Sequence, residues 1–413
     1  MKGLEVRHAL IIGAGPAGTV AALGLQKAGW EPEIYEAYDR SAGLSQGVFL
    51  TVAVNGLDAL SAIGADHAVR ELGFPTGRIR FLSGAGKDLG ALPIGPRLAD
   101  GTVTRTLRRA DLYAALQDLA RERGIPVHHG KRLDGATHAD GTVTAEFADG
   151  TAASGELLIG ADGLRSTVRP LIDASTPAPR YTGMGNVGAL TRSSTLDVSA
   201  EAADGDYRMI WGKRCFFGYT VSPDGEIWWF ANPPAKRELT SEQLAEPKAL
   251  KRHLVDLLSG DRGPAVEIVA GTDEDEILAG NQYELPRVPF AWQRHHMVLI
   301  GDAAHAVSPA TGQGVSLACE DAVTLARSVR HEPNVSHALA TYADLRRDRV
   351  DRVTKWGAKM GKTKTVGPVG RVARDLLMPR FLALAATPRA MEKQAWLFSH
   401  HIEWDANLTP ART

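Results

Sequence analysis

The chain has 413 residues and a formal net charge of −1, with 44% hydrophobic and 23% charged residues. This length predicts more than one domain, and the near-zero charge gives no long-range field that would attract nucleic acid or an anionic membrane. The two cysteines, Cys215 and Cys319, exclude a disulfide framework and a thiolate metal site, so we expect a cytoplasmic protein.

The first apolar stretch, residues 8–25, is almost free of charge but carries four glycines and a proline, so we do not expect stable insertion in a membrane. Its pattern is that of a strand at 8–12 followed by a helix at 19–28, and a second strand is expected at 33–36. Two strands around a helix that begins with a glycine-rich turn form the opening unit of a dinucleotide-binding fold.

The glycine-rich turn, GAGPAG, matches the spacing GxGxxG. Gly13 would make the tight turn, Gly15 would let the backbone approach a pyrophosphate, and Gly18 would allow close helix–strand packing. Glu36 ends the second strand, where a carboxylate takes ribose hydroxyls and disfavours a 2′-phosphate. FAD or NAD therefore fits this unit better than NADP.

Residues 40–176 predict further strands and one amphipathic helix, at 110–123, which follows a basic extended segment ending in Arg109. A buried strand at 157–159 runs into GADGLRSTVR, with Asp162 at its tip. A simple turn requires the glycine but not the two arginines that follow, so this segment is a candidate part of a ligand site. The strands expected in this region are 47–52, 78–82, 88–92, 102–109, 127–129, 143–147 and 157–159. Those near 74–104 are expected to join the antiparallel sheet that residues 177–272 predict.

Residues 177–272 change character and predict an antiparallel sheet rich in aromatic side chains. Such side chains most often form a core, and the alternative is a wall against a flat apolar ligand. Strands are expected at 207–211, 215–221 and 227–231, and a helix at 250–258.

Side chains alternate along a strand, so Phe217 and Tyr219 share one face and Phe216 lies on the other. We assign the ligand face to Phe217 and Tyr219, together with Trp211, because the Tyr219 hydroxyl would give an apolar wall one polar group. The opposite assignment, with Phe216 toward the ligand, stays open at this point.

The segment MVLIGDAAHAVSPATGQG, residues 297–314, has the clearest pattern of strand, acidic tip and glycine turn. The apolar strand at 297–300 ends in Gly301 and Asp302, at the edge where open α/β sheets receive ligands. The Asp302 carboxylate suits a polyol chain. His305 is expected to be structural or solvent-facing rather than a base, and we name no catalytic residue.

Pro309 and the turn at Gly312 and Gly314 lead into a helix at 315–330, which begins with Val315. The free N–H groups of a helix N-terminus favour a ligand that becomes anionic, as reduced flavin does. The adjacent His295 and His296 would point apart, so no metal site is expected there or elsewhere.

The elements together predict an α/β fold: a Rossmann-like FAD-binding domain, an inserted, mostly antiparallel substrate-binding sheet, and C-terminal helices. The helices expected at 349–361 and 369–384 should pack on the nucleotide domain. The expected divisions are 1–176 and 273–360 for the two parts of the FAD-binding domain, 177–272 for the substrate sheet and 361–413 for the C-terminal helical segment.

Three segments in this order, GAGPAG with Glu36, GADGLRSTVR, and GDAAH followed by a proline and GQG, resemble the single-component FAD monooxygenases of the aromatic-hydroxylase type, such as para-hydroxybenzoate and salicylate hydroxylases. The resemblance runs from about residue 8 to 330 and continues loosely to the C-terminus. One departure is Ser316, where many relatives carry asparagine. We expect no second Rossmann domain for the nicotinamide, so NADH or NADPH would bind transiently, as in the family that the chain resembles.

The resemblance implies a role for each motif residue. Arg109 would contact FAD, Asp302 would bind its ribityl chain, and Asp162 would help to close the FAD site and dock the nicotinamide. The residues expected at the cofactor are Gly13, Gly15, Ala17, Gly18, Glu36, Arg109, Asp162, Asp302, Pro309, Gly312, Gly314 and Val315.

The activity implied is hydroxylation or epoxidation of an apolar, aromatic small molecule with NAD(P)H and O2, through a C4a-hydroperoxyflavin. The alternatives are a flavin-dependent reductase, dehydrogenase or halogenase on the same fold, and a non-catalytic, flavin-binding redox sensor. The sequence does not choose between NADH and NADPH and does not predict an oligomeric state.

Overall fold

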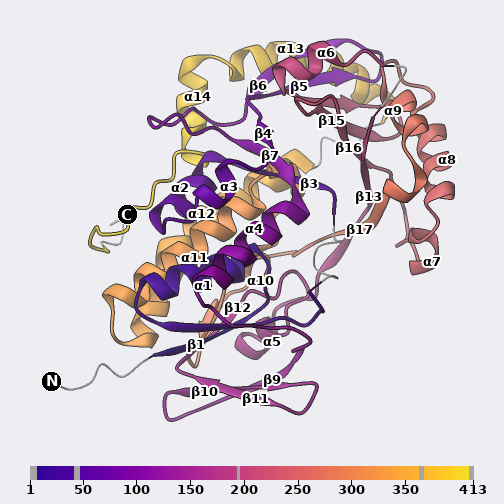
Figure 1. Ribbon diagram of the computed structural model, residues 1–413. Coiled ribbons are helices and arrows are strands. Elements are labelled where there is room, and N and C mark those ends of the chain that lie inside the picture. The colour runs from indigo at the N-terminus through magenta and orange to yellow at the C-terminus, as the bar shows by residue number, and fades with distance from the viewer. Residues whose placement is uncertain (1–6, 41–46, 193–195, 362–366, 409–413) are drawn as a thin grey trace.

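The computed structural model describes residues 7–40, 47–192, 196–361 and 367–408. A six-stranded sheet, parallel except at one edge, organises one unit, and a seven-stranded, mostly antiparallel sheet organises the second (Figure 1). Long helices at the C-terminal end of the chain complete the molecule. This arrangement confirms the predicted fold class, an α/β protein with an inserted antiparallel sheet and C-terminal helices.

The six-stranded sheet is built from distant parts of the chain. Its inner strands are apolar and buried on both faces, as expected for parallel strands covered by helices. Helices α1 (Pro16–Lys27) and α11 (Gly314–His331) pack closely, because Gly24 leaves room for Ala326. In spatial order the strands are β18 (Gln293–Arg294), β19 (Met297–Leu299), β12 (Leu157–Gly160), β1 (His8–Ile12), β2 (Glu31–Tyr35) and β8 (Val127–His128).

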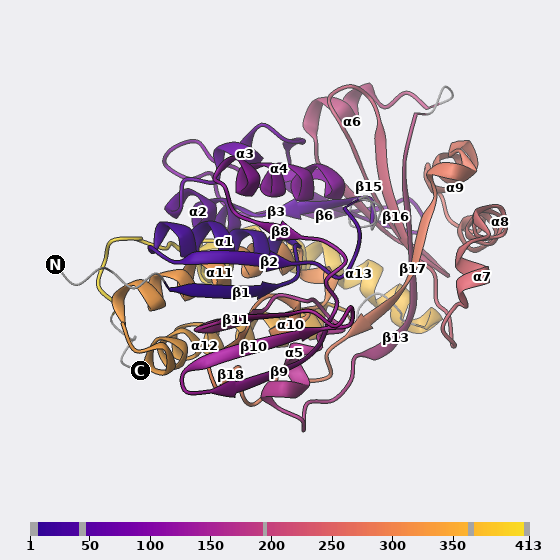
Figure 2. The same cartoon turned by 60° about the horizontal axis from the view of Figure 1, so that its bottom comes forward.

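The seven-stranded sheet, here called the substrate sheet, separates the six-stranded unit from helices α8 (Pro247–Leu258) and α9 (Ala265–Gly271) (Figure 2). The sheet extends beyond residue 272, its expected end, since the segment LAGNQYE forms an edge strand. This strand was not expected because the segment has no apolar run. In spatial order the strands are β17 (Leu278–Glu284), β13 (Arg180–Thr191), β16 (Ile227–Asn232), β15 (Phe216–Val221), β14 (Tyr207–Trp211), β5 (Arg78–Ser83) and β6 (Asp88–Pro93).

Two three-stranded sheets complete the β-structure of the described residues. Of the strands expected at 127–129, 143–147 and 157–159, the first and the last belong to the parallel six-stranded sheet, where they pair with β2 and β1, respectively. The small sheets consist of β9 (Leu133–Ala139), β10 (Thr142–Phe147) and β11 (Ala152–Gly155), and of β3 (Phe49–Val52), β7 (Arg105–Arg108) and β4 (Phe74–Pro75). The other helices are α2 (Val54–Ala62), α3 (His67–Arg70), α4 (Arg109–Glu122), α5 (Val168–Ile172), α6 (Ser199–Asp204), α7 (Ser241–Leu244), α10 (Asp302–His305), α12 (Val335–Gly361), α13 (Pro368–Ala385) and α14 (Pro388–Gln394).

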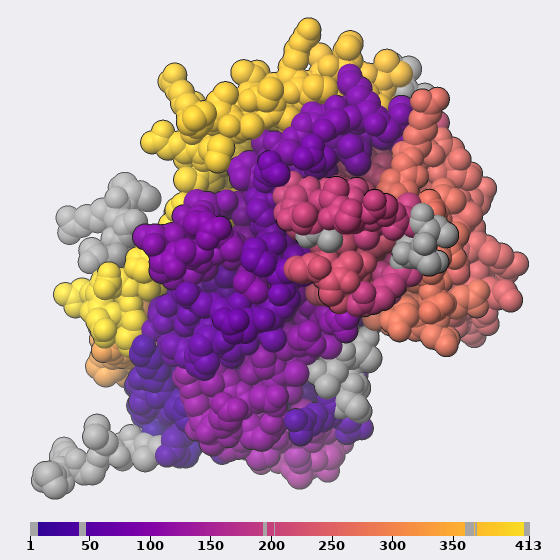
Figure 3. Space-filling model, turned by 45° about the horizontal axis from the view of Figure 1, so that its top comes forward, coloured from indigo at the N-terminus to yellow at the C-terminus, as the bar shows by residue number. Residues whose placement is uncertain are grey.

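The two long C-terminal helices have different partners. Helix α12 packs on α11, as expected for a cover of the nucleotide domain. Helix α13 instead lies over the substrate sheet, where Leu382 and Met378 pack with Trp211 and Phe216. The expectation that both helices cover the nucleotide domain is therefore wrong for α13, which closes an apolar end of the substrate sheet. Helices α13 and α14 form the yellow ridge along the top of the molecule in Figure 3.

A buried cluster of charges joins α11 to α12. Arg346 is fully buried and lies 2.7 Å from a carboxylate oxygen of both Glu320 and Asp321. Arg349 adds a 2.6 Å contact to Glu320, and the ring of His305 lies 2.5 Å from Asp321. Burial alone would raise the pKa of Asp321, but the charges of His305 and Arg346 hold it at about 2. The carboxylates are thus ionised and fully paired in the interior.

Removal of the central cation should be costly. Arg346→Met leaves two buried carboxylates with reduced compensation, so we expect the free energy of unfolding to fall by about 3–5 kcal/mol. A urea titration followed by tryptophan fluorescence measures this change. Arg330→Met, which breaks an exposed ion pair with Asp405, is the matched control and should cost less than about 1 kcal/mol. Equal losses for the two variants would contradict a special role for the buried cluster.

Candidate functional site

The glycine-rich turn between β1 and α1 requires its glycines for distinct reasons. Gly13 has φ +108°, and a Cβ on it would lie 2.5 Å from the carbonyl oxygen of Ala161 at the end of β12. A Cβ on Gly18 would lie 1.9 Å from the Gly13 carbonyl oxygen. At Gly15 the nearest atoms, on Tyr113, are 3.9 Å away. Gly13 and Gly18 are required for close packing, whereas Gly15 leaves the backbone accessible to a ligand.

Glu36 is held against this turn. Its carboxylate accepts a hydrogen bond from the Ala14 N–H at 2.8 Å and one from the Tyr38 N–H at 3.0 Å. The Ala14 carbonyl oxygen accepts a bond from Gln117 Nε2 at 3.1 Å. The acidic residue therefore lies beside the glycine-rich turn, where the strand–helix–strand pattern predicts it.

One face of α4 lines the same region. Arg109, Tyr113 and Gln117 follow at four-residue intervals, so their side chains lie on one side of the helix. The Arg109 guanidinium donates to the Tyr113 hydroxyl at 2.8 Å, and Tyr113 in turn lies next to Gly15. The sequence predicted Arg109 alone. Tyr113 and Gln117 could have been found from their spacing, four and eight residues after Arg109, which places them on the same side of the helix.

Asp302 begins α10 at the end of β19. Gly301 before it has φ +59°, donates its N–H to the Asp321 carboxylate at 2.9 Å, and packs against Ala17. The Asp302 side chain is exposed, and nearby protein atoms partly desolvate its carboxylate. This desolvation raises the pKa of Asp302, against the opposing charges of His305 and Arg109. Ala17, Arg109 and Asp302 thus come together from three separate segments.

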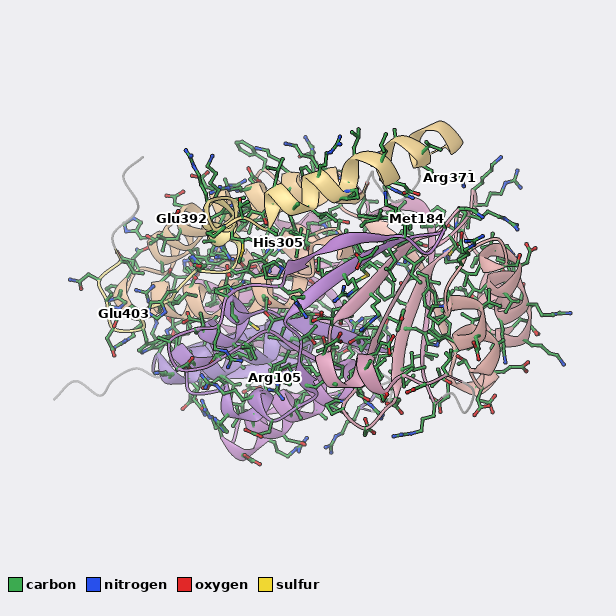
Figure 4. The ribbon with its side chains drawn as sticks, turned by 90° about the horizontal axis from the view of Figure 1, so that it is seen from above. Arg105, Met184, His305, Arg371, Glu392 and Glu403 are labelled. Atoms are coloured by element: carbon green, nitrogen blue, oxygen red, sulfur yellow. The ribbon has the colours of Figure 1, made fainter. Side chains whose placement is uncertain are left out.

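His305 is buried three residues beyond Asp302, within the unit organised by the six-stranded sheet (Figure 4). Burial lowers the pKa of the imidazole, but its contact with the Asp321 carboxylate outweighs this and raises the pKa above its ordinary value. The carboxylate that binds the ring also binds the Gly301 N–H. His305 is therefore a structural residue that fixes the turn bearing Asp302, and it is not solvent-facing.

The turn before α11 leaves open space at two glycines. Pro309 begins a short 3₁₀ helix, Pro309–Thr311, and Gly312 follows with φ +60°. A Cβ on Gly312 or on Gly314 would meet no atom within 4 Å. Val315 lies half-buried in the first turn of α11. A flat ligand can therefore approach this turn and the helix N-terminus without a steric obstacle from these positions.

Buried amides fix this turn from behind. Gln313 is fully buried, and its Oε1 accepts a hydrogen bond from Asn55 Nδ2 at 2.9 Å. The same nitrogen donates to Glu320 at 2.7 Å, which connects the turn to the buried charge cluster. Ser316 accepts the Ala53 N–H at 3.0 Å. The serine that departs from the resemblance thus has a structural partner in this chain.

Asp162 stands at the tip of β12, but its carboxylate serves the fold. One oxygen accepts the N–H groups of Thr167 and Val168, at 2.7 and 3.1 Å, at the start of α5. Desolvation raises the pKa of Asp162 despite these bonds. Arg169 is buried and donates to the Ala303 carbonyl oxygen at 3.0 Å, so this segment also supports the turn that carries Asp302.

The assignment of the ligand face in the substrate sheet is wrong. Phe217 and Tyr219 are buried on the side covered by α8 and α9, where they pack with Trp229. Burial raises the pKa of Tyr219 to about 12. Trp211 shares its face with Phe216 but stacks on Phe81 beneath α13. Both faces of β15 are apolar, so alternation alone did not reveal which one the helices cover.

Within the part of the chain that the structure describes, no group of three or more His, Cys, Asp and Glu side chains is arranged to hold a metal ion. The described helices also include none that is long and apolar enough to cross a lipid bilayer.

Comparison with known proteins identifies the family. The model of the family described as "FAD binding domain" matches residues 7–357. The chain belongs to this family of FAD-dependent monooxygenases. The aurachin C monooxygenase/isomerase of Stigmatella aurantiaca is 30% identical over 356 residues, covering 86% of this chain and 88% of that protein. An FAD-dependent urate hydroxylase of Klebsiella pneumoniae is 29% identical over 351 residues, covering 83% and 86%.

The solved structure of Klebsiella pneumoniae HpxO in complex with FAD and uric acid has a similar fold. It aligns with a TM-score of 0.82 at 25% identity and covers 94% of this monooxygenase chain and 96% of its own. The predicted family and the use of FAD are thereby confirmed. The individual residue roles and the substrate remain predictions at this level of identity.

The corrected face assignment has a measurable consequence. Phe217→Ala removes a fully buried ring, so it should lower the free energy of unfolding of the monooxygenase by about 3–5 kcal/mol and leave the flavin absorbance spectrum unchanged. Phe230→Ala, on the opposite face and only half-buried, is the matched comparison and should cost less. A larger loss of stability for Phe230→Ala would reverse the assignment of the two faces.

Proposed function

We propose that this monooxygenase uses NAD(P)H and O2 to hydroxylate or epoxidise an apolar, aromatic small molecule. The main support is the apolar character of the face of the substrate sheet that lies toward the FAD-binding unit. The centre of this face consists of four uncharged side chains, those of Phe81, Met209, Phe216 and Phe230. Three of the four remain half-buried although they cluster together, which supports room for a further apolar group.

The aromatic face lies next to the proposed cofactor residues. Phe49 in β3 pairs with Arg108, directly before Arg109, and its ring is 6.2 Å from that of Phe230. One short strand therefore connects the start of α4 to the substrate sheet. Gly218 adds to the shape of the face, because a Cβ there would lie 2.6 Å from the Phe230 ring and 2.7 Å from the Met209 sulfur.

The residues present fit FAD in the predicted places. Open space at Gly15, Gly312 and Gly314 would admit the pyrophosphate and the ring system, and two helix N-termini would favour negative charge there. Glu36 would bind the adenosine ribose, and Asp302 with Arg109 would hold the central part of the cofactor. We assign Asp162 a positioning role, because its hydrogen bonds go to the start of α5.

When bound, FAD supplies the electron transfer and the activation of O2. The chain itself has to bind and orient the substrate and exclude water from the reacting atoms. The uncharged face formed by Phe216 and Phe230 performs the last task, since it offers water no hydrogen-bond partner. No catalytic acid or base is needed from the side chains described, so we name none.

Asp302→Ala tests the cofactor assignment. The loss of charge-assisted hydrogen bonds should weaken FAD binding roughly ten- to a hundredfold, because each such bond contributes about 1.5–3 kcal/mol. Titration of the apoprotein with FAD, followed by quenching of flavin fluorescence, gives the dissociation constant. An unchanged constant would leave Asp302 with only a turn-forming role.

The pH dependence of the same titration provides a control. Desolvation raises the pKa of Asp302 in the free protein, while hydroxyl donors of a bound ligand would favour the ionised form. FAD affinity should therefore be constant above the raised pKa and fall as pH drops below it. Asp302→Asn cannot ionise, so it should lose this dependence while other titrating groups stay in place.

The activity itself is tested with the FAD-loaded protein. NADH or NADPH is offered with a panel of phenols, indoles and polycyclic aromatics, and with urate as a polar comparison. We expect an apolar aromatic compound to stimulate the oxidation of NADH or NADPH more than urate does. It should also yield a product heavier by one oxygen atom. Stimulated oxidation without an oxygenated product across the panel would favour a reductase, and no stimulation by any compound would favour a redox sensor.

A further inference from the structure

Helix α13 presents its apolar side to solvent. Its outward residues keep between 58% and 71% of their surface exposed, and they account for most of the large exposed hydrophobic side chains of the described chain. On a helix of 3.6 residues per turn they cover one half of the circumference. These residues are Val372, Leu376, Leu377, Phe381 and Leu384, and Met391 of the following helix, α14, is also exposed.

Three polar residues of α13, Arg371, Arg374 and Asp375, point the other way. Arg371 donates to the carbonyl oxygen of Lys213, and Arg374 lies over the Trp211 ring, with the guanidinium carbon 5.3 Å from its centre. Asp375 pairs with Arg374 at 2.9 Å. An ordinary surface helix buries its apolar side and exposes its charges, so this reversed orientation indicates a contact surface.

The charges on this surface decide between possible occupants. Arg380 projects from the middle of the apolar half of α13, and the described outward residues of that helix include no acid. A second copy of the chain would bury this guanidinium against apolar side chains without a partner, which is costly. At a bilayer surface, its long side chain reaches the anionic headgroups while its stem stays among the acyl chains.

We propose that α13 and α14, the ridge in Figures 3 and 4, dock on the surface of an anionic phospholipid bilayer. Arg389 and Lys393 of α14 are exposed and share one side of that helix, about 200° from Met391, so they add two cations at the edge of the ridge against the single acid Glu392. The net charge of −1 excludes a global attraction but not this local one. The helix would lie in the interface, and the inference does not depend on the proposed substrate.

Co-sedimentation of the FAD-loaded protein with vesicles tests the proposal. One set of vesicles contains phosphatidylcholine and phosphatidylglycerol in equal parts, and the second contains phosphatidylcholine alone. The variant Leu376→Ser/Phe381→Ser/Leu384→Ser should lower the partition coefficient by about tenfold or more. Phe290→Ser is the matched control, since Phe290 is 88% exposed outside the ridge, and it should bind as the wild type does.

Arg380→Glu separates the two contributions and keeps the test valid if the triple variant folds poorly. It should reduce binding to the anionic vesicles and abolish the preference for them over neutral ones. Melting temperature and flavin content serve as the checks of folding. A wild type that stays in the supernatant with both vesicle types would overturn the proposal. A dimer in light scattering that the triple variant abolishes would also overturn it, because a second copy would then cover the ridge.

Discussion

The architecture depends on two carboxylates that the chain places side by side within a buried helix. Glu320 and Asp321 are adjacent in α11, so their side chains leave the helix in directions about 100° apart. Arg346 from α12 reaches both, and this single guanidinium fixes how the two helices lie against each other. An ion pair removed from water tolerates little misplacement, because a broken contact leaves an uncompensated charge. The cluster therefore selects one arrangement of these helices.

The same two carboxylates support two separate turns of the candidate cofactor site. Asp321 binds the Gly301 N–H and His305, which sets the turn that carries Asp302. Glu320 binds Asn55, which sets Gln313 and with it the open turn before α11. Two turns that would otherwise be independent surface loops are thus attached to one rigid pair of helices. Precise placement of a cofactor requires such support from behind.

Local patterns predicted those parts of the fold and site in which one segment carries its own signal. The strand, glycine turn and acidic tip of the first unit follow from residues close in sequence, and the structure brings Gly15, Glu36, Arg109 and Asp302 to one region. The edge strand β17 and its neighbour β13 were missed because glycine and polar residues interrupt any apolar alternation. The network around Asn55 was missed because its partners lie more than 250 residues away.

The face of the sheet and the position of α13 could not be predicted for a different physical reason. In β15 all six residues are buried, so the alternation that separates core from surface carries no information about which side meets the helices. In α13 the apolar half faces outward, and a rule that turns apolar residues inward then places the helix incorrectly. Both errors concern apolar faces for which we propose a partner other than solvent, a ligand in one case and a bilayer surface in the other.

The pairing of β12 with β19 also determines how the chain assembles. Leu158 lies opposite Met297, 139 positions later in the sequence, with the substrate sheet inserted between them. At a synthesis rate of about 5–20 residues per second, roughly 7–28 s pass before β12 meets this neighbour on the ribosome. Until then one edge of the apolar strand β12 has no neighbouring strand in the nascent domain. The inserted sheet can fold during this interval, whereas the nucleotide-binding half is completed only after it.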